Sequence, residues 1–229
     1  IINNDEVIKS LKDKILLVKP DLIIFPTQSQ TKVDKDILII CKNRKIKTLY
    51  LIDNWDNLSD KSIMLDKPDY LGVWGEQTKN HAVDIQKINS KKIFKMGTPR
   101  FDIYFNNRKK RLKKINNFKY ILFLGTALEF DEFRILAKID NILKKNFCLK
   151  NIKLLYRPHP WRMSKRIFDF NKYQNIKLDP QIKNNFYKKK IDESFQPDLN
   201  YYPNLIKNSE FVIGGLTSMI IESLIMYKK

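Results

Sequence analysis

The sequence predicts an α/β fold with mostly parallel sheets, and two features of its pattern support this. Short apolar runs alternate with longer segments of helical periodicity, the order of elements in parallel α/β domains. All six glycines lie in or just after the apolar runs, where glycine permits a tight turn from strand to helix. The predicted strands are 21–26, 47–52, 69–74, 92–96, 119–124, 152–156 and 211–213, and the predicted helices are 6–18, 34–44, 76–88, 129–146 and 218–227.

The 229 residues are enough for two small domains, and a basic stretch separates two similar halves of the chain. This stretch, NNRKKRLKKINN at 106–117, has weak hydrophobic patterning, which favours a solvent-exposed linker. We therefore expect one Rossmann-like domain at 1–105 and a second at 118–229. The chain opens within a helix-like segment and stops in or just after another, so both domains are expected to be partial and the chain a fragment.

The charge of the chain is strongly basic, with 44 Lys and Arg against 25 Asp and Glu and a formal net charge of +19. The basic residues are 36 Lys and 8 Arg, and Arg is the side chain that reads phosphate forks and base edges. We therefore expect no nucleic-acid partner. The charge favours anionic substrates or an anionic membrane surface. A non-catalytic basic module that binds nucleic acid or anionic lipid stays as an alternative.

Few residues of the chain are suited to metal binding or disulfide formation. Cys41 and Cys148 lie far apart, and the two histidines are His81 and His159, so neither a thiolate site nor a His-rich metal site is expected. The cysteine usage fits a reducing compartment. The sequence shows no signal-peptide core and no apolar run of about 18 residues. We expect a cytoplasmic protein that needs no metal or other cofactor.

The familiar nucleotide-binding signatures G-x-G-x-x-G and G-x-x-x-x-G-K-[ST] are absent, so candidate residues are sought in the loops that follow strands. The run FVIGGLTSMIIE contains a turn at Gly214 and Gly215 and a helix that begins near Thr217 or Ser218. The N–H groups at such a helix start favour a phosphate, and Glu222, one turn on, is placed to accept from ribose hydroxyls. An ordinary helix cap with a solvent-facing Glu explains the same pattern equally well.

The loop YRPHPWR follows the strand predicted at 152–156 and is the sharpest single motif. Two prolines frame His159, and Arg157 and Arg162 flank it, a set suited to donating hydrogen bonds to phosphate or diphosphate oxygens. The alternative is a histidine that merely caps the loop.

Three more loops contribute candidates. Gly125 and Thr126 follow the strand predicted at 119–124 and are expected to offer backbone N–H groups to the same anion. Asp53 and Asp56 in DNWDNLSDKS could supply a general base for an acceptor hydroxyl, although such runs more often serve turns. The segment KMGTPRFDIY resembles a hinge and places Arg100 near the acceptor side of the cleft.

The motifs GTPRFD, RPHPW and GGLTSMIIE, taken in order over roughly 47–229, resemble the GT-B glycosyltransferases of bacterial surface-polysaccharide synthesis. Closest are the CDP-glycerol glycerophosphotransferases and the His-Pro-motif CMP-sugar transferases, and the non-hydrolysing UDP-N-acetylglucosamine 2-epimerases share that fold. The resemblance implies that the C-terminal domain holds the nucleotide, with His159, Thr217 and Ser218 on phosphate and Glu222 on ribose. It matches Asp56 to the base position, although this chain has W-D-N where the glycerophosphotransferases have W-H-G.

The resemblance therefore implies a metal-independent glycosyltransferase that moves a sugar from a nucleotide sugar to a hydroxyl of a glycan or lipid-linked acceptor. Catalytic roles are expected for Asp56 and His159, and a helix dipole with basic side chains would replace a metal. A CDP-glycerol-type polyol-phosphate transferase, a UDP-GlcNAc 2-epimerase-like enzyme and an inactive relative stay open. Peripheral contact with the inner membrane face is a further expectation, because lipid-linked acceptors lie there.

Overall fold

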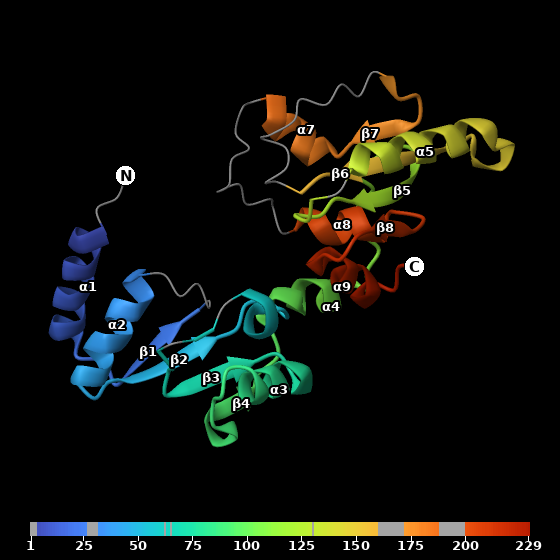
Figure 1. The fold of residues 1–229 in the computed structure, drawn as a ribbon. Helices are drawn as coiled ribbons and strands as arrows, with labels where there is room; N and C mark the ends of the chain where they lie inside the picture. Colours follow the sequence, from blue (N-terminus) through green and yellow to red (C-terminus); the bar gives the residue numbers. More distant parts are fainter. Residues whose placement is uncertain are drawn as a thin grey trace. The chain divides into compact units, whose positions relative to one another are not determined.

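The computed structural model describes residues 4–26, 32–61, 63–64, 66–129, 131–159, 172–187 and 200–229 (Figure 1). The chain divides into two compact units, Ile1–Pro99 (unit 1) and Arg100–Lys229 (unit 2). Each unit contains a four-stranded sheet in which every neighbouring pair of strands is parallel. This confirms the predicted α/β class with two Rossmann-like sheets.

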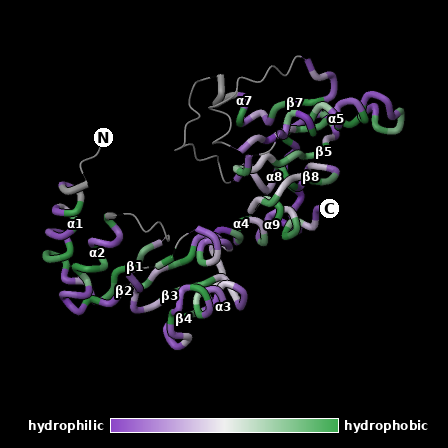
Figure 2. The backbone as a smooth tube through the Cα atoms, viewed as in Figure 1, coloured by the Kyte–Doolittle hydropathy of each residue, from purple (hydrophilic) through white to green (hydrophobic). Residues whose placement is uncertain are grey.

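Unit 1 carries its sheet in the order β1-β2-β3-β4, so each strand pairs with the next one along the chain. Its elements are α1 (Asn4–Val18), β1 (Leu22–Phe25), α2 (Lys32–Asn43), β2 (Lys47–Leu51), the π-helical turn η1 (Asn57–Lys61), β3 (Tyr70–Val73), α3 (Glu76–Asp84), η2 (Ser90–Lys92) and β4 (Ile93–Lys95). Apolar residues follow one another in β1 (LIIF) and β3 (YLGV), which is typical of parallel sheets, whereas β2 (KTLYL) and β4 (IFK) each include a lysine (Figure 2).

The two faces of this sheet differ in burial. On one face Phe25 stacks on Tyr50 with ring centroids 4.3 Å apart, within a core that also contains side chains of α2 and α3. On the other face Ile24, Phe94 and Met96 stay about half exposed. Unit 1 therefore has one packed sheet face and, among the described residues, one open apolar face.

A residue with left-handed backbone follows α2, and it is a lysine where a glycine is usual. Lys45 has φ +58°, and its N–H donates to the carbonyl of Lys42 while the N–H of Ile46 donates to the carbonyl of Cys41. These two hydrogen bonds form a Schellman motif, in which glycine is usual because a Cβ is strained at positive φ.

We expect Lys45→Gly to raise the free energy of unfolding by about 0.5–1 kcal/mol, because relief of the left-handed strain outweighs the added chain entropy of glycine. Urea unfolding followed by the fluorescence of Trp55 and Trp74, both in unit 1, measures this. Lys45→Ala is the control and should show no such gain, because it keeps the Cβ. A glycine variant less stable than the alanine variant would contradict the assignment.

Unit 2 has the strand order β7-β6-β5-β8. Its elements are η3 (Pro99–Phe101, beginning at the last residue of unit 1), α4 (Asp102–Asn107), β5 (Lys119–Leu124), α5 (Glu132–Lys145), η4 (Phe147–Leu149), β6 (Ile152–Arg157), β7 (Ile176–Leu178), α7 (Pro180–Tyr187), α8 (Tyr201–Lys207), β8 (Val212–Gly214) and α9 (Ser218–Ile225). In contrast to unit 1, both faces of this sheet are covered, with α5 on one side and α8 and α9 on the other (Figure 1).

The side-chain pattern of β5 and α5 explains this packing. Alternate residues of β5, Ile121 and Phe123, join the core with Leu136 and Leu143 of α5. On the other side the Tyr120 hydroxyl donates to the carbonyl of Leu205 in α8, 2.7 Å away. None of the described helices of the chain is both long and apolar enough to span a membrane.

The boundary between the units lies at Pro99 and Arg100, whereas the sequence suggested the basic run 106–117. The reason is that this run is fastened to unit 2. The Lys207 ammonium donates to the carbonyl of Arg108, and the Asn208 side-chain amide donates to the carbonyl of Lys113, 2.9 Å away. The run is therefore part of the surface of unit 2.

Candidate functional site

The candidate site of unit 2 lies at the carboxyl edge of its sheet. The chain proceeds from β5 to β6 and β7 on one side of β5 and then crosses to β8 on the other side. The switch point of the topology therefore lies between β5 and β8, the place where open α/β sheets bind ligands. The Thr126 hydroxyl, after β5, lies 3.4 Å from the carbonyl oxygen of Leu216, after β8, and connects the two loops.

Gly125 lets the loops after β5 and β6 approach each other. Its N–H donates to the carbonyl of Arg157 over 2.7 Å. A Cβ at this position would lie 2.8 Å from the backbone nitrogen of His159 and 2.9 Å from the Cα of Pro158. Because these are backbone atoms, no side-chain rotation could relieve the clash, and the position of the His-Pro loop depends on this glycine.

We expect Gly125→Ala to lower the free energy of unfolding by about 1–3 kcal/mol, because the added methyl group displaces the loop that carries His159. Chemical denaturation measures the loss. Gly75→Ala is a suitable control, since none of the described residues comes within 4 Å of a Cβ built there and its φ of −172° is extended backbone. Equal losses in the two variants would refute the close contact.

Glu132, which the sequence analysis did not single out, is buried directly behind these loops. Its carboxylate accepts the N–H of Thr126 over 2.9 Å and the hydroxyl of Tyr156. The sequence suggested that Gly125 and Thr126 donate backbone N–H groups to a bound anion. The structure corrects this, because the N–H of Gly125 donates to the Arg157 carbonyl and that of Thr126 to Glu132. The signal in the sequence was an acidic residue in the first helical turn after a strand and a glycine.

Arg157 was expected to bind phosphate, but its side chain points into the interior and is 3% exposed. Its guanidinium donates to the Tyr202 hydroxyl, lies 4.6 Å from the centre of the Tyr202 ring and pairs with Asp179 at 3.8 Å. Asp179 in turn accepts the N–H groups of Gln181 and Ile182 at the start of α7. Burial raises the pKa of the Asp179 carboxyl, and the Arg157 charge opposes that shift. Arg157 therefore holds β6, β7 and α8 together.

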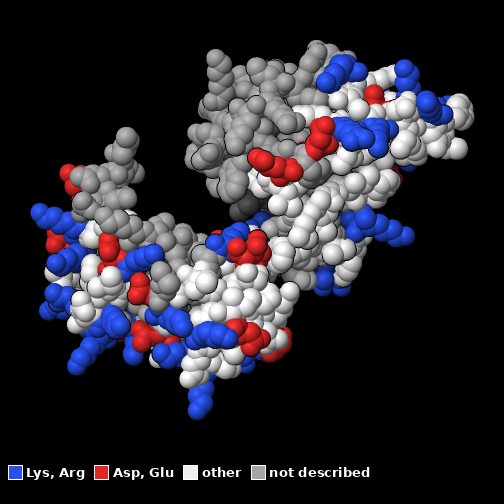
Figure 3. Space-filling model, in the orientation of Figure 1, with Lys and Arg blue, Asp and Glu red and all other residues white. Residues whose placement is uncertain are grey.

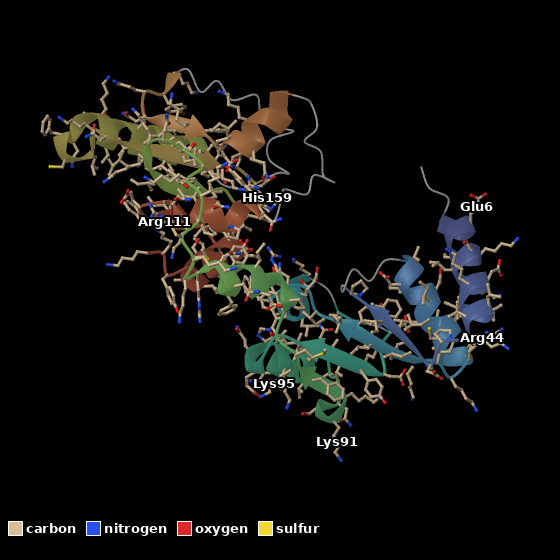
Figure 4. The ribbon with its side chains drawn as sticks, turned by 180° about the vertical axis from the view of Figure 1, so that it is seen from behind. Glu6, Arg44, Lys91, Lys95, Arg111 and His159 are labelled. Atoms are coloured by element: carbon tan, nitrogen blue, oxygen red, sulfur yellow. The ribbon has the colours of Figure 1, made fainter. Side chains whose placement is uncertain are left out.

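The outer part of the site consists of His159 and the start of α9. His159 is half-buried after β6, and Figure 4 labels it at that end of the strand. Thr217 is the N-cap of α9 with extended φ and ψ, and its side chain makes no capping hydrogen bond. Ser218 begins the helix, and Gly215 precedes this turn, as predicted. Arg162 lies outside the described residues.

Glu222 is buried and both of its carboxylate oxygens are bound from α4 and the turn before it. The Arg100 guanidinium donates to Oε1 over 3.1 Å, and the Tyr104 hydroxyl donates to Oε2 over 2.7 Å. Burial raises the pKa of the Tyr104 hydroxyl, and the Glu222 charge raises it further. Glu222 is therefore neither solvent-facing nor a free acceptor for ribose. Together with Arg100 and Tyr104 it forms an anchor that joins α9 to α4.

We expect Tyr104→Phe to lower the free energy of unfolding by about 1–3 kcal/mol, because the variant leaves a buried carboxylate oxygen without its donor. Tyr50→Phe is the matched control. Among the described residues the buried Tyr50 hydroxyl has no hydrogen-bond partner, so its removal should be neutral or stabilising. Urea unfolding of the two variants side by side measures the difference, and equal effects would argue against the anchor.

The two aspartates predicted in unit 1 follow β2. Asp53 is exposed and accepts a hydrogen bond from the Asn57 side chain. Asp56 is partly buried, with one carboxylate oxygen 3.3 Å from the Lys61 ammonium and its carbonyl accepting the N–H of Asp60. Both therefore contribute to the turn around η1, and a role for Asp56 as a base stays a prediction.

No cluster that could hold a metal is found in the described part of the chain, where no three or more His, Cys, Asp or Glu side chains come together suitably. Metal independence stays a prediction.

Comparison with known proteins gives a likeness of fold. No protein-family model and no curated protein sequence matches the chain. Among solved structures, the chain is similar to a UDP-GlcNAc 2-epimerase from Methanocaldococcus jannaschii (TM-score 0.59, 17% identity, 97% of this chain and 64% of that one). It is also similar to a putative UDP-N-acetylglucosamine 2-epimerase from Listeria monocytogenes (0.60, 12%, 97% and 60%). A third is the UDP-GlcNAc 2-epimerase from Neisseria meningitidis bound to UDP-GlcNAc (0.58, 15%, 94% and 60%).

At this level of identity the likeness shows the fold alone. The chain spans between 60% and 64% of the length of these three solved proteins. It shares their α/β fold with two Rossmann-like units. Activity and substrates are separate questions.

Proposed function

We propose that unit 2 binds the nucleotide part of a nucleotide sugar and that the chain belongs to an enzyme acting on this substrate. The observation that carries the proposal is the start of α9. There the Thr217 side chain makes no capping hydrogen bond, and the helix start lies beside the topological switch point of a doubly covered parallel sheet. Such a helix start favours a diphosphate through its N–H groups and its dipole.

The neighbouring side chains suit the same ligand. The hydroxyls of Thr217 and Ser218 lie at the helix start, and His159 follows the adjacent strand β6. A protonated or N–H-donating imidazole there would balance charge on the departing phosphate. Arg157 is not part of this set, because its guanidinium is buried in the pair with Asp179.

Ribose recognition by Glu222, as the resemblance implies, requires access to a buried carboxylate whose two oxygens already accept hydrogen bonds from Arg100 and Tyr104. Tyr104 is 3% exposed and fixed in the core. The Arg100 side chain is 44% exposed, so it is the partner that can swing away when ribose hydroxyls arrive. The proposal therefore includes an exchange at Oε1 of the Arg100 guanidinium for a ribose hydroxyl.

The likeness to solved epimerases favours epimerisation at C2 of a UDP-sugar as the reaction. Inversion of a carbon that bears hydrogen requires a base that removes a proton and an acid that returns one. His159 follows β6 at the carboxyl edge of the sheet, and we assign it to proton transfer or phosphate binding.

Glycosyl transfer is the second candidate, and the order of the GTPRFD, RPHPW and GGLTSMIIE motifs favours it. In this reaction the sugar leaves a nucleoside diphosphate and joins an acceptor hydroxyl. Positive charge and helix N–H groups stabilise the departing phosphate, and Asp56 would accept the proton of the acceptor.

The test of nucleotide binding is a thermal-shift titration with UDP, CDP, CMP, GDP and ADP. A ligand that binds the native state stabilises it by about 2.7 kcal/mol at a hundred times its dissociation constant. We expect UDP to raise the melting temperature of the wild type and His159→Ala to lose most of this shift. His81→Ala, on α3 of unit 1, should keep it. Absence of a shift with every nucleotide would refute the proposal.

The two reactions are separated by incubating the chain with UDP-GlcNAc and following the sugar by NMR. Epimerisation gives a new UDP-sugar without release of UDP, whereas transfer releases UDP only when an acceptor is present. Nucleotide binding without either product would leave unit 2 as a nucleotide-binding unit and remove both reactions for this chain.

A further inference from the structure

One surface of unit 2 combines basic and exposed apolar side chains. It consists of residues 105–114, from the end of α4 onward, and residues 224–227 at the end of α9, and is called here the basic–aromatic surface. Six of the seven residues from 108 to 114 are Lys or Arg, and no acidic residue occurs between 103 and 119. Lys109, Lys110 and Arg111 are exposed, and Figure 4 labels Arg111. The surface therefore attracts anions.

Apolar side chains lie among these cations. The Arg108 guanidinium lies 5.0 Å from the ring centre of Phe105 and 5.4 Å from that of Tyr227, which joins the end of α4 to the end of α9. Phe105 is 48% exposed, Tyr227 65% and Leu224 64%. Phosphate recognition does not require exposed Phe and Leu side chains, whereas the interface of a lipid bilayer accepts them together with cations.

The surface is held in place by the rest of unit 2. The carbonyl groups of Arg108 and Lys113 accept hydrogen bonds from the side chains of Lys207 and Asn208. Near the end of α9, the N–H of Lys228 donates to the carbonyl of Ser223. Because these bonds already order the backbone, binding would cost little conformational entropy there.

Its position leaves the candidate site open. The basic run leads into Lys119, the first residue of β5, and therefore lies toward the amino edge of the sheet. The loops that carry Gly125 and His159 follow the last residues of β5 and β6, at the opposite edge. A flat partner on the basic–aromatic surface would not cover those loops.

Figure 3 shows lysines and arginines scattered over both units, so net charge alone does not define this surface. What distinguishes the surface is the combination of cations with exposed apolar residues.

We propose that the basic–aromatic surface docks unit 2 onto an anionic phospholipid bilayer. Its Lys and Arg side chains contact the headgroups, and Phe105, Leu224 and Tyr227 enter the interface. This goes beyond the proposed nucleotide binding and is independent of it.

The test is sedimentation with phosphatidylcholine vesicles that contain either no anionic lipid or about one third phosphatidylglycerol. We expect the wild type to bind the anionic vesicles and not the neutral ones. A triple variant, Lys109→Ala with Lys110→Ala and Arg111→Ala, should bind roughly a hundredfold less, at about fivefold for each cation. The control triple, Lys42→Ala with Lys91→Ala and Lys92→Ala, removes the same charge from exposed positions of unit 1 and should keep most of the binding.

A second variant distinguishes lipid from other polyanions. Phe105→Ser with Tyr227→Asn should weaken vesicle binding about tenfold and leave binding to inorganic polyphosphate unchanged, because polyphosphate has neither acyl chains nor bases to contact the apolar side chains. Asn suits the left-handed backbone of Tyr227, whose φ is +57°. The proposal is overturned if the wild type does not bind the anionic vesicles, if both triple variants lose binding equally, or if the Phe105 and Tyr227 variant binds vesicles as the wild type does. The rise in melting temperature on addition of UDP, measured on the same samples, reports nucleotide binding separately.

Discussion

A carboxylate removed from water must find donors inside the protein, and the described residues of unit 2 include three such groups. Glu132, Asp179 and Glu222 are each almost fully buried. Each joins elements that the sheet alone does not join: Glu132 connects α5 with the loop after β5 and with β6, and Asp179 connects α7 with β6. Glu222 connects α9 with α4. Since an uncompensated buried charge costs several kcal/mol, these carboxylates determine how the helices can be placed around the sheet.

The same constraint explains which parts of the structure were predictable from the sequence. The strand at 119–124 was predicted as observed, because KYILFL is an apolar run buried on both faces. The strand β7 was missed, because IKL is only three residues long and its central lysine interrupts any run of apolar residues. The loop candidates at Gly125 and His159 do meet. Whether a given N–H or guanidinium already has a partner depends on residues far apart in the chain, as for Glu222 and Arg100, and no local pattern encodes that.

The two units differ in how completely they cover their sheets. In unit 2 helices lie on both faces, and the candidate site is at one edge of a closed core, so loops there rest on a rigid base. In unit 1 one sheet face carries half-exposed Ile24, Phe94 and Met96. The segment after β2 is nevertheless tied to its neighbours by hydrogen bonds, such as the one from the indole N–H of Trp74, after β3, to the carbonyl of Ile52, 2.8 Å away. Order in unit 1 therefore comes from one packed face and from its turns.

The pair of Arg157 and Asp179 restricts how sequences with this fold can diverge. A chain that lost only one of the two residues would keep an unpaired charge in its interior. Such a single variant would be destabilised. Replacement of both by apolar residues of similar volume avoids this destabilisation, and the start of α7 would then need a new cap in place of Asp179. In homologous chains we therefore expect either arginine together with aspartate at these two positions or neither residue. Covariation between positions 157 and 179 would then identify the pairing of β6 with β7 even in chains whose overall sequence similarity is low.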